Sequence, residues 1–184
     1  MKVAETFDVA ASVETVWNLF QDVPLVAACL PGAELTGREA DGSYRGCVKV
    51  RLGPMESTFE GTATITPDLI SRSGRIVGTG IDRRGGSRGR VEVNYTVAPV
   101  ALGTRVAIEA DINLSGAAAQ FGRPGIIMEV ARRLVGEFAD CLAATLGPAG
   151  RRSGGPAPIK GGRLFLAALW GAVAGFLRRL FRGG

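Results

Sequence analysis

The sequence contains no histidine in its 184 residues. Histidine is the usual general base near neutral pH and the commonest metal ligand, so its absence excludes Ser-His, Cys-His and His-metal chemistry. Cysteine is scarce as well, with Cys29, Cys47 and Cys141 forming an odd set that lacks CxxC spacing. This set indicates neither a disulfide framework nor a zinc site, and we expect a reducing compartment.

Carboxylates are the acid-base groups that remain. Glu56, Glu60, Glu109 and Asp111 alternate along predicted strands, in the phase opposite to the apolar residues. We therefore assign them to a solvated outer face, with a carboxylate site as the lesser alternative. We expect no catalytic residues, no metal ion and no covalently bound cofactor.

Acidic residues are missing from the last 38 residues, which carry seven basic ones. The residues before them have 15 basic and 17 acidic side chains, a net charge of −2, so the chain's overall charge of +5 comes from the tail. We predict a folded domain over residues 1–146, a flexible Gly/Pro/Arg linker over 147–162 and a membrane-anchoring helix over 163–184.

Long hydrophobic runs are also absent, because the longest uncharged run of the tail, residues 164–177, has 14 residues. Fourteen helical residues extend about 21 Å against a hydrocarbon core of about 30 Å, which favours an interfacial or shallowly inserted helix over a full span. A tail packed on a partner protein is the remaining alternative. The predicted membrane-contacting residues are Leu164, Phe165, Leu166, Leu169, Trp170, Val173, Phe176, Leu177, Arg178, Arg179, Leu180, Phe181 and Arg182.

Membrane binding is expected on the cytoplasmic side. The N-terminal residues MKVAETFDV lack the apolar segment of a signal peptide, which predicts a cytoplasmic domain. Basic residues are attracted to the anionic lipids of the cytoplasmic leaflet. We therefore expect a peripheral protein held at the inner face of the cell membrane.

Within residues 1–146 the hydrophobic period changes twice. Residues 2–10 predict a strand, followed by one helix capped by Ser12 and a second beginning at Asp22. Residues 34–114 alternate between apolar and polar, which predicts antiparallel strands, about six or seven in all. Residues 121–146 return to helical spacing and predict one long helix of about 35 Å. This order predicts an α+β domain whose curved sheet packs its dry face on the long helix.

Four motifs occur in order along this domain: Cys29-Leu30-Pro31-Gly32, then Val50-Arg51-Leu52-Gly53-Pro54 running into Phe59-Glu60-Gly61, then a glycine-rich segment over 78–90, and AQFGR at 119–123. Through these motifs residues 1–146 resemble the G-subunit family of carbon monoxide dehydrogenase, within the START and polyketide cyclase-like superfamily. The resemblance implies the helix-grip fold, in which a curved antiparallel sheet wraps a C-terminal helix and encloses a ligand cavity. It also implies an accessory protein of a molybdenum-containing dehydrogenase, connected with membrane recruitment, and it supplies no catalytic residues.

A cavity is also suggested by small residues on the dry face. Gly61, Ala63, Ala110 and Ala131 lie among larger apolar residues and leave space for a ligand, with a filled core as the alternative. The predicted lining is Val48, Val50, Phe59, Val91, Val93, Tyr95, Ile108, Ile112, Ile127, Val130 and Leu134. The hydroxyl of Tyr95 is expected to fix one polar atom of the ligand.

Six arginines lie between residues 72 and 90 among glycines and serines, which predicts a basic hairpin. No aromatic residues are interleaved with these arginines, so nucleic-acid binding is disfavoured. A docking surface for an acidic partner or for lipid headgroups, and a plain solvated loop, both stay open.

The cavity and the tail together predict a membrane-tethered, non-catalytic carrier of a hydrophobic small molecule. We expect this molecule to be a respiratory quinone, menaquinone or ubiquinone, because a soluble dehydrogenase must pass electrons to the membrane pool. No residue identifies the quinone. Two alternatives stay open: a recruitment or assembly module for the dehydrogenase without a ligand, and a polyketide cyclase-like enzyme.

Overall fold

The computed structural model describes residues 1–52, 55–121 and 124–147. In these residues seven strands and four helices follow one another in the order β1 (Lys2–Val9), α1 (Val13–Gln21), α2 (Val23–Cys29), β2 (Ala33–Arg38), β3 (Tyr44–Leu52), β4 (Met55–Asp68), β5 (Ser73–Asp82), β6 (Ser87–Val100), β7 (Gly103–Ser115), α3 (Ala117–Phe121) and α4 (Pro124–Leu146).

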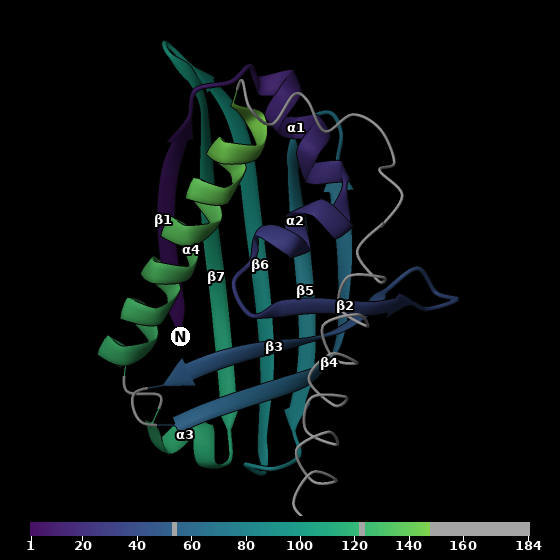
Figure 1. Ribbon diagram of the computed structural model, residues 1–184, viewed down its shortest axis with the longest axis vertical. Helices are drawn as coiled ribbons and strands as arrows, with labels where there is room; N and C mark the ends of the chain where they lie inside the picture. Colours follow the sequence, from purple (N-terminus) through teal and green to yellow (C-terminus); the bar gives the residue numbers. More distant parts are fainter. Residues whose placement is uncertain (53–54, 122–123, 148–184) are drawn as a thin grey trace, which may run out of the picture. The chain divides into compact units, whose positions relative to one another are not determined.

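All seven strands form one antiparallel sheet in the order β1-β7-β6-β5-β4-β3-β2. Strand β1 pairs with β7 at one edge of the sheet, and β2 lies at the other edge. Helices α1 and α2 carry the chain from one edge to the other. Figure 1 shows α1, α2 and α4 over the same face, which we call the covered face, while β3 and β4 cross the lower half of the sheet at a steep angle to β5, β6 and β7. The predicted α+β fold with a curved antiparallel sheet is confirmed.

The two N-terminal helices begin at side-chain caps, as the sequence predicts. The Oγ atom of Ser12 accepts a hydrogen bond from the backbone N–H of Thr15 at 3.3 Å, at the start of α1. The carboxylate of Asp22 accepts the N–H of Leu25 at 3.1 Å and caps α2. Each cap satisfies an N–H group that has no partner inside its helix.

The predicted long C-terminal helix is confirmed as the 23-residue helix α4, which begins at Pro124. The structure adds the short helix α3 before it, which the sequence did not predict. Proline lacks an N–H and fits the first turn of a helix, which suits Pro124 to the start of α4. The Oγ atom of Ser87 accepts the N–H of Ala118 at 2.9 Å and holds α3 against β6.

Aromatic side chains fill the core beneath α1. The rings of Phe20 and Tyr95 lie 5.1 Å apart, and Phe20 meets Phe138 of α4 edge-to-face at 6.1 Å. Phe138 also meets Phe7 of β1 edge-to-face at 6.1 Å. Offset and edge-to-face pairs at these separations stabilise a core beyond their buried area. This cluster therefore joins α1, the sheet and α4.

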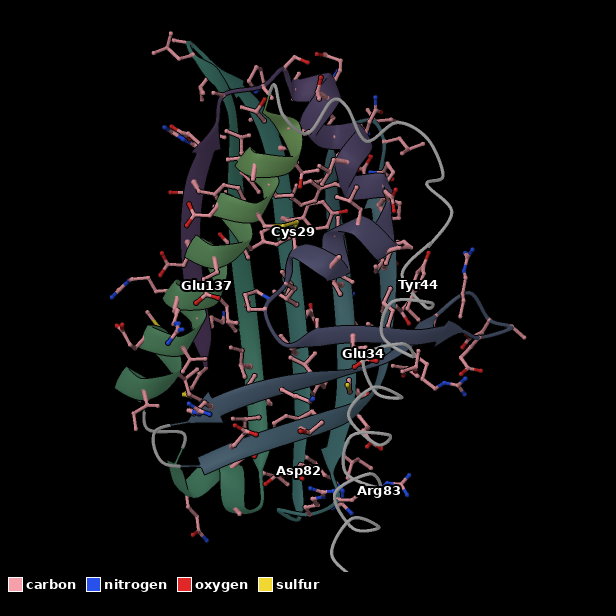
Figure 2. All side chains as sticks on the ribbon, in the orientation of Figure 1. Cys29, Glu34, Tyr44, Asp82, Arg83 and Glu137 are labelled. Carbon is pink, nitrogen blue, oxygen red and sulfur yellow. A yellow bond between two sulfur atoms is a disulfide. The ribbon has the colours of Figure 1, made fainter. Side chains whose placement is uncertain are left out.

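A disulfide joins Cys29 of α2 to Cys141 of α4, with 5.4 Å between the Cα atoms. The expectation of no disulfide is therefore wrong. The two cysteines are 112 residues apart in the chain and meet because α2 and α4 pack on the same core; Figure 2 shows Cys29 between these helices. Cys47 is a free, half-buried thiol.

Replacing Cys29 and Cys141 together by Ala lowers the free energy of unfolding by about 2–5 kcal/mol, because the bond closes a loop of more than a hundred residues. Urea unfolding of the double variant and the wild type measures the difference. The Cys47→Ala control keeps the wild-type midpoint. A wild-type midpoint that reductant leaves unchanged would show that the disulfide does not form in solution.

A row of four glycines crosses the covered face where the sheet bends. The strand register pairs Gly46 with Gly61, Gly61 with Gly80, and Gly80 with Gly89. A Cβ atom at Gly61 would collide with the backbone carbonyl of Thr79 on the neighbouring strand. Glycine is required at position 61 because two backbones approach closely, so Gly61 does not provide the ligand space that the sequence suggested.

Gly61→Ala is expected to lower the free energy of unfolding by about 1–3 kcal/mol, since the added methyl group meets backbone that has little room to move. Gly136→Ala is the control, because Gly136 is an exposed residue of α4 with open space around it. That change leaves stability unchanged or raises it by up to about 1 kcal/mol. Equal melting temperatures for Gly61→Ala and the wild type would contradict the close approach.

Candidate ligand-binding site

The structure places the predicted lining residues on the covered face of four strands and on α4. The register sets Val48 of β3 opposite Phe59 of β4, and Val91 of β6 opposite Ile112 of β7. These strand positions share the side-chain phase of the buried residue Val106 or its register partner Val97. Helix α4 contributes the remaining lining residues, Ile127, Val130 and Leu134.

Packing is complete beneath α1 and incomplete around most of the predicted lining residues. Beneath α1 the side chains of Val16, Val106 and Leu142 are fully buried, with 0% exposure. Nine of the eleven predicted lining residues are only half-buried: Val48, Val50, Phe59, Val91, Val93, Ile108, Ile112, Val130 and Leu134. Protein interiors are normally packed to crystal-like density. An apolar surface that stays partly accessible is suited to a hydrophobic ligand.

Tyr95, one of the two fully buried lining residues, lies in the packed aromatic core. Its ring is 3% exposed and sits 6.4 Å from the Trp17 ring, and burial raises the pKa of its phenol. Its hydroxyl lies beside Gly74 of β5, where a Cβ atom would overlap it. This placement gives no support to the predicted contact between Tyr95 and a polar atom of the ligand. Ile127, the other buried residue, is 4% exposed.

A buried polar cluster that the sequence analysis missed lies at the turn between β5 and β6. The carboxylate of Asp82 accepts the N–H of Gly85 at 3.0 Å, and this bond is the main cause that lowers the pKa of Asp82. Ser57 lies close enough to lower this pKa further, yet its Oγ atom makes no hydrogen bond of good geometry and is closed to solvent. The fully buried Ser87 completes the cluster. These groups close the hairpin onto α3 and are not open to a ligand; Figure 2 labels Asp82 at the end of the sheet away from α1.

The arginines of the predicted basic hairpin divide into two groups. Arg72 pairs with Glu14 at 3.3 Å, and Arg75 pairs with Glu92 at 2.7 Å and lowers the pKa of that carboxyl. The other four are exposed and form no ion pair within the described parts of the chain: Arg83, Arg84, Arg88 and Arg90. The hairpin therefore presents four exposed arginines at the end of the sheet opposite α1, where Asp82 near Arg84 and Glu92 near Arg90 offset part of the positive charge.

The four carboxylates that alternate along the strands lie on the outer face, as predicted. Glu56, Glu60 and Glu109 are exposed, and Asp111 pairs with the N-terminal amine at 3.1 Å. Glu5 of β1, which the sequence analysis did not single out, instead has the phase of the covered face and approaches Arg132 of α4 at 3.7 Å. In the residues that the structure describes, no group of three acidic or cysteine side chains is placed to hold a metal ion.

A family model for CoxG, the G-type subunit of carbon monoxide dehydrogenase, matches residues 6–147. The chain belongs to this family. No curated protein matches it. The name of the family implies association with a carbon monoxide dehydrogenase.

Several solved structures share the fold at low sequence identity. A conserved protein from Geobacillus kaustophilus is 15% identical with a TM-score of 0.69, covering 79% of this chain and 95% of its own. A START superfamily protein from Mycobacterium smegmatis is 16% identical with a TM-score of 0.50, covering 79% and 96%. The Zhui aromatase/cyclase from Streptomyces sp. R1128 is 20% identical with a TM-score of 0.50, covering 83% and 94%. These likenesses confirm the START-like fold and show nothing further.

The predicted membrane anchor, residues 163–184, and the linker from residue 148 onward lie outside the described residues. Among the helices that the structure does describe, none has the length and apolar character needed to cross a membrane.

Proposed function

We propose that this member of the CoxG family is a membrane-tethered, non-catalytic carrier. It binds a hydrophobic small molecule, a respiratory quinone, between the sheet and α4, and it links a molybdenum-containing dehydrogenase to the membrane electron pool. The observation that carries the proposal is the half-buried apolar surface of nine side chains beside a fully packed core. A protein that served only as an anchor would need no such surface.

The polar groups of the interior support a binding role over catalysis. The Ser57 hydroxyl is closed to solvent, and Tyr95 lies in the packed core. Glu5 lies on the edge strand β1 and faces Arg132, so the pair is partly solvated. General acid-base catalysis requires a proton-transfer group within hydrogen-bond reach of the substrate. Of these groups, Glu5 alone is the register partner of a lining residue, Ile108, and its carboxylate is paired with Arg132.

Recruitment of the dehydrogenase without a ligand is the second candidate. It is favoured by the unpaired arginines Arg83, Arg84, Arg88 and Arg90, which suit an acidic protein surface. The two candidate functions differ in one property, because only a carrier needs space for a ligand between the sheet and α4.

Ala110→Phe is expected to weaken binding of menaquinone-2 at least tenfold, because the new ring occupies the space that the ligand needs. Ala110 is half-buried on the covered face of β7, between Val3 and Val93. Ala107→Phe is the matched control, because Ala107 lies on the outer face of the same strand. This variant is expected to bind menaquinone-2 as tightly as the wild type does. Native mass spectrometry with added menaquinone-2 measures both variants.

The recruitment module gives the opposite pattern in the same experiment. No menaquinone-2 is then retained by the wild type, and Ala110→Phe overpacks a filled core at a cost of about 1–3 kcal/mol. A melting temperature that falls strongly, without ligand binding in any sample, would replace the carrier with the recruitment module.

We place the tether at the cytoplasmic leaflet, whose anionic lipids suit the seven basic residues of the tail. Replacing Arg178, Arg179 and Arg182 by Ser is expected to weaken vesicle binding and reduce its salt dependence, by about 1 kcal/mol for each charge. Leu169→Ser and Phe176→Ser weaken binding equally at low and high salt. Flotation with phosphatidylglycerol vesicles distinguishes the two effects, and unchanged flotation of both variants would indicate a tail bound to protein.

A further inference from the structure

Three large apolar side chains project from turns between strands. Ile70 is 97% exposed and Leu69 is 68% exposed in the turn between β4 and β5, and Leu102 is 92% exposed in the turn between β6 and β7. They are the most exposed large hydrophobic residues in the described parts of the chain. A single exposed apolar residue needs no explanation, whereas several gathered at one end of a domain indicate an interaction site.

The turns hold these side chains away from the protein. The carboxylate of Asp68 accepts the N–H groups of Ile70 at 2.9 Å and Ser71 at 3.2 Å, which fixes the turn that carries Leu69 and Ile70. The carbonyl of Arg72 accepts the N–H of Val97 at 2.9 Å and ties the same turn to β6. An apolar side chain held rigidly in water is unfavourable unless a partner covers it.

Both turns flank the junction between β1 and α1. Arg72 pairs with Glu14 in the first turn of α1, and the hydroxyl of Thr104 donates to the carbonyl of Ala11 at 2.8 Å. The last residue of α4, Leu146, packs against the same core cluster as Val13. Figure 1 shows the C-terminal end of α4 beside α1. The exposed apolar turns and the point where the chain leaves the domain therefore lie at the same end.

We propose that this end, the apolar tip formed by Leu69, Ile70 and Leu102, docks into the boundary between headgroups and acyl chains of a lipid membrane. The inference rests on the tether of the proposed function, because the basic and apolar tail follows α4 from this end. Only 16 residues, 147–162, separate α4 from the tail in the sequence, so a tail bound to a membrane keeps the domain close to the same surface.

The charged groups near the apolar tip are mostly paired. Asp8 pairs with Arg105 at 2.7 Å and Glu14 with Arg72, which limits repulsion by anionic lipid. Asp68 has no ion pair among the described residues, and hydrogen bonds from Ser71 and Ile70 lower the pKa of its carboxyl, so this one charge must stay at the level of the headgroups. The arginines of the hairpin without an ion pair lie at the opposite end of the sheet, which this orientation leaves in water.

The orientation is tested with an environment-sensitive NBD label on the full chain, in a Cys47→Ser background with the disulfide intact. Labels are placed at Ile70→Cys and Leu102→Cys, and at Arg84→Cys in the opposite hairpin as the control. On vesicles of phosphatidylcholine and phosphatidylglycerol, the emission of the first two labels shifts to shorter wavelength, and that of the third stays at its value in water.

The outcomes separate the docking from the tether. If the protein floats with the vesicles but the emission of both tip labels stays at its value in water, the docking is overturned and the tether is not affected. A chain that does not float at all would overturn both, and a blue shift at Arg84→Cys would show that the other end docks.

A second variant tests the energetic contribution of the apolar tip. Replacing Leu69, Ile70 and Leu102 together by Ser is expected to weaken vesicle binding about tenfold or more, independently of salt. The control replaces Leu35 and Ile81 by Ser, two exposed apolar residues outside these turns, and it binds as the wild type does. Equal binding of the two variants would overturn the docking.

Discussion

The contact of Phe20, Tyr95 and Phe138 is the interaction on which the rest of the domain depends. It joins α1, the middle of the sheet and α4 in one aromatic cluster, and the disulfide between Cys29 and Cys141 links α2 to α4 beside it. Because this cluster supplies much of the tight packing, apolar side chains elsewhere on the covered face can stay partly open without unfolding the domain. The packed core and the half-buried apolar residues thus occupy different parts of the same covered face.

Curvature is the second requirement for such an arrangement. A flat sheet would leave the half-buried residues facing water, whereas the glycine row from Gly46 to Gly89 lets β3 and β4 turn steeply across β5, β6 and β7. Glycines at strand positions commonly mark such bends, because close backbone approach leaves no space for a side chain. The strands that carry Val48 and Phe59 therefore form a wall of the interior, together with the central strands and α4.

Local patterns predicted the elements of the fold because each depends on neighbours in the chain. The cap at Ser12, the alternation around Val106 and the helical spacing around Phe138 identified a strand, two helices, a meander and a final helix, and the same periods gathered the lining residues on one face. Features that depend on distant contacts were missed. The Cys29–Cys141 bond, the reason for glycine at position 61 and the direction of the Tyr95 hydroxyl all follow from how separate elements pack, which spacing along the chain does not contain.

The disulfide also determines how the interior can open. The C-terminal half of α4 is fixed to the packed core by Cys141, Phe138 and Leu142. The N-terminal half can then move only by rotation about this fixed half. The eighteen residues from Pro124 to Cys141 extend about 25 Å, and a rotation of about 10° about Cys141 moves the Pro124 end by about 4 Å. For the carrier proposed above, ligand exchange by this route would need only a small change at the core. Reduction of the disulfide would remove the covalent link between α4 and α2, and α4 could then also shift at its C-terminal half, which the oxidised protein does not allow.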